Sequence, residues 1–151
     1  MGHILYAPFL FFSQNGGLIY MYLLETEAAF DAAHFLSNYN GKCKNIHGHR
    51  WRVIATIKGE VMDGMLVDFN IFKKDLKAIC DYFDHTFIVE EGSLESDIYD
   101  RLCELFEIRD VDFRTTAENF SKYFFDELSK KYDVESVCVY ETPTNKAVYR
   151  K

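Results

Sequence analysis

The alternation of side chains in HGHRWRVIATIKGE, residues 47–60, limits most strongly what this chain can fold into. Successive side chains of a strand point to opposite faces, so a period of two predicts a β-strand. One face of it carries His47, His49, Trp51 and Val53. LLETEAAFDAAH, residues 23–34, has the same period, with Leu24, Ala28, Phe30, Ala32 and His34 on one side. We expect two paired strands with histidines where they meet the connecting loop.

The remainder of the sequence mixes helix and strand patterns, which predicts an α+β fold. Asp63 and Gly64 indicate a turn, after which MLVDF, residues 65–69, predicts a short third strand that returns beside the second. Apolar residues at helical spacing predict a helix over residues 71–83, capped by Asn70.

Two more helices and one strand are expected toward the C-terminus. IYDRLCELF, residues 98–106, predicts one helix, and the pair Thr115-Thr116 opens another over residues 117–131. The last strand should run over residues 134–141. Its apolar row ends in a carboxylate: Val137, Val139, Glu141.

Composition indicates an ordinary folded protein of one domain, with 151 residues and 48% hydrophobic side chains. A net charge of -7 disfavours a nucleic-acid partner, which draws on a basic surface, although local lysines can still bind a small anion. Candidates by charge are Lys42, Lys44 and Arg50. The cysteines, at positions 43, 80, 103 and 138, form no CxxC pair, which favours a reducing, cytoplasmic location.

The first twenty residues are treated separately, as an N-terminal extension (1–20) before a single domain (21–151). The extension is apolar at both ends but is interrupted by SQNGG, so neither a membrane span nor a secretory signal is expected. Asn15-Gly16 predicts a hairpin turn between two apolar strands. The alternative is an upstream addition to a chain that starts at Met21.

His34, His47 and His49 are candidate metal ligands. Histidines two residues apart on a strand point the same way, and a third on the neighbouring strand completes a three-nitrogen set with an open position, as catalytic zinc requires. The alternative, a merely polar face, is about equally common on spacing alone.

Cys43 lies between Lys42 and Lys44, whose charges favour a thiolate. It is a candidate base or nucleophile, or alternatively the fourth ligand of a closed structural metal site. Asp84-His85 is either an acid and base pair or a charged helix cap. Glu118 fits a capping box, Thr115-x-x-Glu118. Glu141 is harder to explain structurally, because a carboxylate on an apolar face needs a partner.

The segments FDAAH, CKNIHGH, GMLVDF, DH, TAENF and VYET occur in an order that resembles the family of 6-pyruvoyl-tetrahydropterin and 6-carboxytetrahydropterin synthases. The resemblance extends from about Met21 to Arg150, and the combination is more specific than any single motif. Two departures stand out. Thr115 occupies a position where proline commonly precedes Thr-x-Glu-Asn, and the segment 86–113 is longer than in compact members.

The resemblance implies a T-fold, or tunnelling fold: an antiparallel sheet with helices on one face, joined by oligomerisation into a barrel of trimers or stacked hexamers with active sites between subunits. It implies that His34, His47 and His49 hold Zn²⁺ and that Cys43 is the proton-transferring thiolate. Asp84 and His85 resemble the pair that works with this cysteine across the interface. Glu141 resembles the acid that anchors the pterin ring, and Thr116 and Glu118 match further pocket positions.

The activity implied first is that of a lyase, a 6-carboxy-5,6,7,8-tetrahydropterin synthase that acts on 7,8-dihydroneopterin triphosphate in queuosine and deazapurine biosynthesis. A 6-pyruvoyl-tetrahydropterin synthase is the second alternative, and a folate-pathway variant that releases a hydroxymethyl pterin is the third. From a different class, the chain is a non-catalytic oligomer that binds zinc or pterin.

Overall fold

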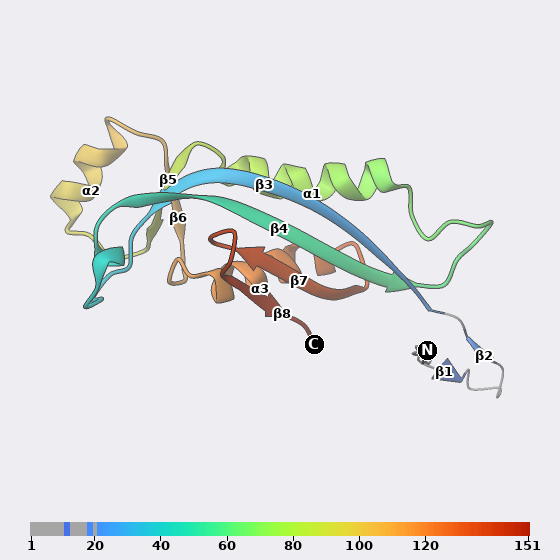
Figure 1. The fold of residues 1–151 in the computed structure, drawn as a ribbon. Helices are drawn as coiled ribbons and strands as arrows, with labels where there is room; N and C mark the ends of the chain where they lie inside the picture. Colours follow the sequence, from blue (N-terminus) through green and yellow to red (C-terminus); the bar gives the residue numbers. More distant parts are fainter. Residues whose placement is uncertain (1–10, 13–17, 20) are drawn as a thin grey trace.

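The computed structural model describes residues 11–12, 18–19 and 21–151. Two short strands precede a curled six-stranded sheet, which three helices accompany (Figure 1). The strands are β1 (Phe11–Phe12), β2 (Leu18–Ile19), β3 (Tyr22–His34), β4 (His47–Gly59), β5 (Thr86–Glu90), β6 (Ile108–Val111), β7 (Val134–Tyr140) and β8 (Lys146–Tyr149). The helices are η1 (Lys42–Lys44, a 3₁₀ turn), α1 (Phe69–Phe83), α2 (Ser96–Cys103) and α3 (Ala117–Ser129).

The two predicted histidine-bearing strands are confirmed as β3 and β4. They pair antiparallel along their whole length, from Tyr22 opposite Gly59 to His34 opposite His47. The predicted alternation is also confirmed, because Phe30, Ala32 and His34 are buried while the residues between them are not.

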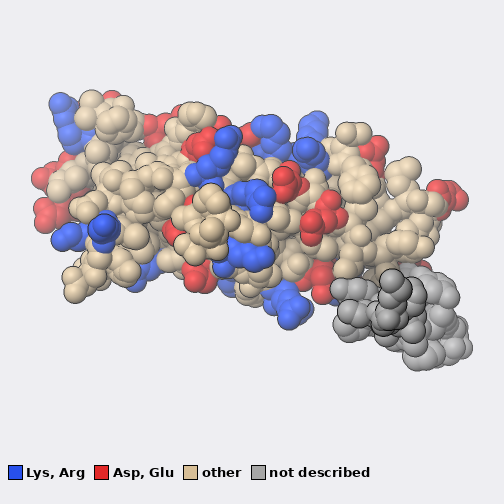
Figure 2. Space-filling view, viewed as in Figure 1, with Lys and Arg blue, Asp and Glu red and all other residues tan. Residues whose placement is uncertain are grey.

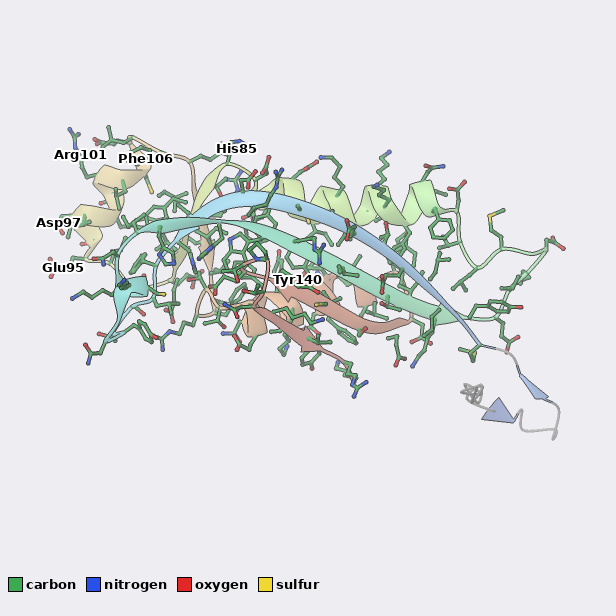
Figure 3. All side chains as sticks on the ribbon, in the orientation of Figure 1. His85, Glu95, Asp97, Arg101, Phe106 and Tyr140 are labelled. Atoms are coloured by element: carbon green, nitrogen blue, oxygen red, sulfur yellow. The ribbon has the colours of Figure 1, made fainter. Side chains whose placement is uncertain are left out.

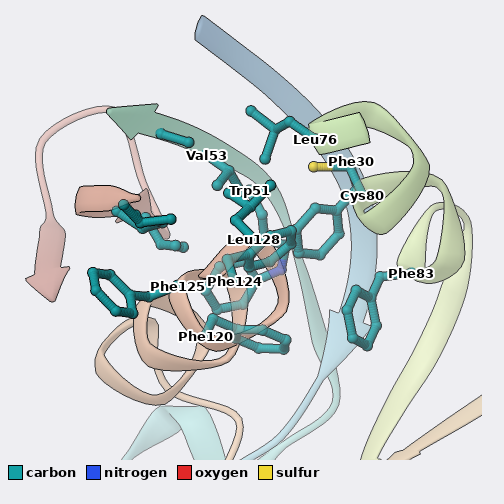
Figure 4. Packing of buried hydrophobic residues seen from close by; sticks show 14 of the residues in the cluster. Phe30, Trp51, Val53, Leu76, Cys80, Phe83, Phe120, Phe124, Phe125 and Leu128 are labelled. Atoms are coloured by element: carbon teal, nitrogen blue, oxygen red, sulfur yellow. The ribbon is translucent and has the colours of Figure 1, made fainter. Parts of the chain in front are cut away.

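One face of this strand pair forms the hydrophobic core. α1 and α3 both pack on it, and their side chains surround Phe30 and Trp51, which are 1% and 0% exposed (Figure 4). The Trp51 ring lies with its centroid 4.9 Å from that of Phe120 on α3 and 5.0 Å from that of His34. The histidines therefore continue the same face that the helices cover, at its end.

The sheet is mixed rather than purely antiparallel. Its order is β6-β5-β3-β4-β7-β8, in which β5 runs parallel to β3 and β6 parallel to β5. α2 lies in the connection between β5 and β6, as parallel strands require a crossover. The α+β class is confirmed. The strands β5 and β6 and the C-terminal β8 were not expected.

The expected third strand over residues 65–69 is wrong. The Asp63-Gly64 turn is present, with both residues at positive φ, but only Met62 and Met65 pair across it, in one isolated bridge. Phe69 already belongs to α1. Beyond this one bridge, the residues on either side of the turn do not pair, so the turn does not extend into a strand. The chain enters α1 instead.

The cap of α1 is Asp68, not Asn70. The Asp68 carboxylate accepts a hydrogen bond of 2.7 Å from the Asn70 backbone N–H, so the helix begins two residues earlier than expected. Asp and Asn both serve as caps, and the extended backbone of Asp68 decides between them.

Asp68→Ala is expected to lower the free energy of unfolding by about 1 kcal/mol, because one of the unpaired N–H groups of the first turn loses its acceptor. Asn70→Ala, the matched control, should change stability by less than about 0.5 kcal/mol. Urea unfolding of both variants measures the difference. Equal losses would contradict the assignment of the cap.

The other helix boundaries also shift. α2 spans Ser96–Cys103 rather than 98–106, and the cap of α3 is Thr116, whose hydroxyl accepts from the Asn119 N–H at 3.4 Å. The expected capping box from Thr115 to Glu118 is therefore wrong, because the Thr115 side chain is bonded elsewhere.

At the N-terminus, β1 and β2 pair antiparallel, as the predicted hairpin requires, while the Asn15-Gly16 turn itself lies outside the described residues.

All four cysteines are free. Burial raises the pKa of the Cys80 thiol to about 12, so this cysteine is an inert core residue. Within the described part of the chain, no helix is long and apolar enough to cross a membrane.

Candidate metal centre and active site

Three histidines from the adjoining ends of β3 and β4 form the candidate metal centre. His34 ends β3, and His47 and His49 begin β4 on the same face. One nitrogen from each ring lies within 4.8 Å of the others, and the ring centroids are 4.5 to 5.3 Å apart. Three imidazoles at this separation fit one transition-metal ion after small side-chain rotations.

Hydrogen bonds orient two of these rings toward the centre. His34 Nδ1 lies 2.9 Å from the Thr115 carbonyl oxygen and His47 Nδ1 lies 2.8 Å from the Asn45 carbonyl oxygen. A carbonyl only accepts, so each Nδ1 carries the proton and each Nε2 presents a lone pair. Both Nε2 atoms are buried and have no hydrogen-bond partner within the described residues, as expected of metal ligands.

Burial lowers the pKa of two of the rings, those of His34 and His49. Desolvation, followed by the nearby His47, lowers the pKa of His34 from 6.5 to about 4, although its bond to Thr115 opposes this. Burial likewise lowers the pKa of His49, against the opposing charge of Glu141. Neutral imidazole is the form that binds metal, so His34 is ready to bind above about pH 4.

Glu141 lies directly after β7 and faces this group. Its Oε1 is 3.7 Å from His34 Nε2 and 4.0 Å from His49 Nε2, and its side chain is 31% exposed. Its backbone N–H donates to the Asn145 carbonyl at 3.1 Å, which holds it in the turn between β7 and β8. The carboxylate on the apolar row is thereby explained by the histidines beside it.

Thr115 is a site residue that sequence reasoning assigned to the helix cap. It is fully buried, and its hydroxyl donates to the Phe35 carbonyl at 3.0 Å while lying 3.2 Å from His34 Nδ1. Because that hydrogen is committed to Phe35, the oxygen is an acceptor for His34. No spacing rule links residues so far apart in sequence, so only the fold reveals the contact.

Thr115→Val is expected to weaken metal binding by about tenfold. It removes the hydroxyl acceptor from His34 but keeps the carbonyl acceptor. The loss of affinity should therefore lie at the lower end of the roughly 10–100-fold range typical of losing a residue that hydrogen-bonds to a metal ligand. Competition with a metal-binding dye measures it. Thr115→Ser should restore the wild-type affinity, and a Val variant with unchanged affinity would contradict the role.

Cys43 lies in η1, in the loop that joins the two histidine strands. It is half-buried, and its carbonyl accepts from the Leu36 N–H at 2.8 Å, which ties the two sides of the loop together. Among the described residues, the group able to hold a metal consists of the three histidines and does not include the Cys43 thiol.

Asp84 and His85 form a bonded pair at the end of α1. His85 Nδ1 lies 2.8 Å from Asp84 Oδ2. Two hydrogen bonds attach the pair to β3: the Asp31 backbone N–H donates to Asp84 Oδ1 at 2.8 Å, and the His85 backbone N–H donates to the Asp31 carbonyl at 2.7 Å. The Asp31 N–H, followed by His85, holds the pKa of Asp84 below its ordinary value. Asp84 is therefore an anion beside an exposed imidazole.

This pair is not next to the histidines of its own chain. It lies on the β5 side of β3, whereas β4 lies on the other side. Asp31 and His34 are three positions apart on β3, which is about 10 Å along the strand. Figure 3 labels His85 at the start of β5 and Tyr140 at the end of β7, with the β3 and β4 ribbons running between.

The last two predicted site residues, Thr116 and Glu118, lie at the start of α3, next in the chain to Thr115, which contacts His34. Thr116 follows Thr115 directly and caps the helix, and Glu118 is exposed in the first turn. Neither side chain forms a hydrogen bond or ion pair with the three histidines, so their roles stay predictions.

The fold and the site together define a class: α+β proteins whose curled sheet brings three histidines to one edge of a helix-covered face. The family model of 6-pyruvoyl tetrahydropterin synthase matches residues 23–151. The chain belongs to this family.

Curated relatives and solved structures agree with that assignment. A 6-carboxy-5,6,7,8-tetrahydropterin synthase from Haemophilus influenzae is 33% identical over 141 residues, 87% of this chain and 100% of the relative. One from Bacillus subtilis is 32% identical, over 87% of this chain and 86% of the relative.

A solved 6-pyruvoyl tetrahydropterin synthase from Plasmodium falciparum superposes with a TM-score of 0.66 at 22% identity, over 87% of this chain and 98% of that chain. An uncharacterized protein from Wolinella succinogenes superposes with a TM-score of 0.72 at 21% identity, over the same shares. These two similarities describe the fold.

Proposed function

We propose that this protein is a zinc-dependent 6-carboxy-5,6,7,8-tetrahydropterin synthase, a lyase acting on 7,8-dihydroneopterin triphosphate. The observation that carries the proposal is the group of three inward-facing histidines with Glu141 beside it. Relatives of that name, matched over most of both chains, support the reaction.

Zinc is the ion that this donor set fits best. Three imidazole nitrogens with no fourth histidine are a common catalytic zinc set, and they leave a position for substrate. Bound there, zinc would act as a Lewis acid on the oxygen-bearing side chain of the substrate. The Nδ1 hydrogen bonds of His34 and His47 to backbone carbonyls determine that the Nε2 of each ring would face the ion.

Cys43 is the proposed base. Elimination of triphosphate begins with removal of a proton from a side-chain carbon, and a thiolate in the loop between the two histidine strands is well situated to take it. The proton is then passed on or returned, which needs an acid and base pair. Asp84 and His85 have the required hydrogen bond, and because they lie away from the histidines of their own chain, we assign them to the site of a neighbouring subunit.

Glu141 is the proposed anchor of the pterin ring. A carboxylate accepts two parallel N–H groups from an amino-pyrimidine edge, which orients the side chain of the substrate toward the ion. Thr116 and Glu118 are proposed as further pocket residues on the first turn of α3.

The proposal includes a homo-oligomer, a trimer or a hexamer, in the cytoplasm, with residues 21–151 as the catalytic domain. The family match over residues 23–151 supports the domain boundary, and the separation of the Asp84 pair from the histidines supports a site shared between subunits.

The direct test is incubation of the purified, zinc-loaded protein with 7,8-dihydroneopterin triphosphate, followed by mass spectrometry of the products. We expect a 6-carboxy tetrahydropterin, released tripolyphosphate and a two-carbon fragment that holds the other two carbons of the substrate side chain. A pyruvoyl or hydroxymethyl product would select one of the alternative activities, and absence of turnover would contradict the lyase assignment.

A non-catalytic zinc protein is the second candidate, and the proximity of Glu141 to two of the rings favours it, because this carboxylate is a possible fourth ligand. Glu141→Gln separates the two. If Glu141 anchors the pterin, the variant should keep its zinc and raise KM by about tenfold or more, since one charge-assisted contact is lost. Loss of zinc in the same variant would favour the closed site.

A further inference from the structure

A cavity opens in the loop that follows β3, the strand that ends in His34. It has a volume of about 470 Å³ and is lined by residues 35–40 together with Lys44 and Ser93. The lining starts one residue after His34 and includes the residue after Cys43. The cavity therefore shares a loop with the proposed base and a strand end with the metal centre.

Two cations belong to this region. Lys44 lines the cavity, and Arg114 supports its wall: an Nη2 hydrogen bond of 2.8 Å reaches the Ser37 carbonyl, and the guanidinium carbon lies 5.9 Å from the Tyr39 ring centre. Elsewhere the charges are mixed, since Figure 2 shows Lys and Arg interspersed with Asp and Glu over the face seen. With a net charge of -7, anion binding needs such a local pair of cations.

Two buried polar atoms here have no partner. Among the described residues, the Ser93 hydroxyl and the Arg114 Nε are both buried without a hydrogen bond. Buried donors are nearly always satisfied in native proteins, so unpaired ones point to a missing acceptor. The Glu90 carboxylate, at the end of β5, accepts a hydrogen bond of 2.8 Å from the Ser37 hydroxyl. Arg114 Nε only donates, whereas the Ser93 hydroxyl can donate or accept, so an acceptor group would satisfy either of them.

The other cations near the site are less suitable. The Arg50 guanidinium lies 3.5 Å from the Asp31 carboxylate, and its side chain alternates to the face of β4 opposite His47 and His49. Lys42 shares η1 with Lys44, and both are exposed, but Lys42 does not line the cavity.

We propose that this cavity binds the triphosphate of the substrate, with Lys44 and Ser93 as contacts from its lining and Arg114 as the residue that holds Ser37 in its wall. The inference rests on the proposed function. In 7,8-dihydroneopterin triphosphate, one methylene and one ester oxygen join the hydroxyl-bearing carbons to the phosphates, so a side chain bound at the histidines extends its phosphates into an adjoining pocket. Phosphate oxygens are strong acceptors for an ammonium, a guanidinium and a hydroxyl.

The test compares Lys44→Gln with Lys42→Gln in the full-length, zinc-loaded protein. Both changes remove one positive charge from η1 beside Cys43, but only Lys44 lines the cavity. Calorimetric titration with inorganic tripolyphosphate should show an affinity about tenfold weaker for Lys44→Gln and less than twofold weaker for Lys42→Gln. Ser93→Ala should weaken it by a few fold. KM for the substrate should follow the same order.

The outcomes separate this inference from the proposed function. If the wild type binds tripolyphosphate through Lys44 but makes no pterin product, the cavity assignment holds and the proposed function fails. If the wild type turns over substrate while both lysine variants bind tripolyphosphate and substrate equally, the function holds and the cavity assignment is overturned. No tripolyphosphate binding by the wild type at millimolar concentration would also overturn it.

Discussion

His47→Ala should lose bound zinc and turnover together. The change removes one of three nitrogens from a centre with no other ligand in its group, so metal affinity should fall by more than the roughly 10–100-fold typical of losing only a supporting partner. Zinc content after dialysis, measured by atomic emission, and product formation from 7,8-dihydroneopterin triphosphate report the two losses.

Asn45→Ala is the matched control for this variant. His47 Nδ1 bonds to the backbone carbonyl of Asn45, which an alanine retains, so zinc content should match the wild type. Far-UV circular dichroism should show that both variants keep the fold, because His47 lies at the end of β4 beyond the packed core. A His47→Ala protein that keeps stoichiometric zinc would remove this residue from the ligand set.

Cys43→Ala should abolish most turnover while leaving zinc in place. Removing a general base typically lowers kcat by about 10²–10⁴-fold, and the Cys43 thiol does not belong to the group of metal-holding atoms. The expected pattern is thus full zinc content, little change in KM and a large fall in kcat. Single-turnover assays with mass detection of the pterin product measure it.

Two results would contradict the assignment in different ways. Full turnover in Cys43→Ala would exclude this thiol as the base. Loss of zinc in the same variant would instead favour the closed structural site, with cysteine as fourth ligand. Cys103→Ala, a change at an exposed cysteine of α2, should alter neither quantity and controls for removal of a thiol.

Periodicity predicted the parts of the fold in which one face of an element is buried. The strands over residues 22–34 and 47–59 were readable because their inward residues form a strict alternation that ends in histidine. The helices α1 and α3 were readable from apolar residues at helical spacing, such as Phe72 and Phe120. The start of α1 was not, since Asp68 and Asn70 are chemically equivalent caps before the backbone conformation is known. The start of α3 at Ala117 was predicted, and the sequence left open only which of Thr115 and Thr116 caps it.

The parallel edge of the sheet escaped prediction for a different reason. β5, TFIVE, is buried on both faces in its first four residues, so it lacks the alternation that marks a half-exposed strand. Its pairing with β3 and β6 depends on the crossover through α2, a contact that no local pattern encodes. A short apolar run bounded by His85 and Glu91 was the one available signal.

By itself, the sequence determined the histidine-bearing strand pair, the two helices of the core and the family, because these rest on local periodicity and on a fixed order of motifs. The tertiary structure alone decided how the candidate site is supported. It brings Thr115 to His34, holds Glu141 beside two rings and sets Asp84 and His85 on the far side of β3. It also brings Lys44 and Ser93 to one cavity, whose wall Arg114 supports. These are contacts between residues far apart in the chain, and only packing and strand order bring such residues together.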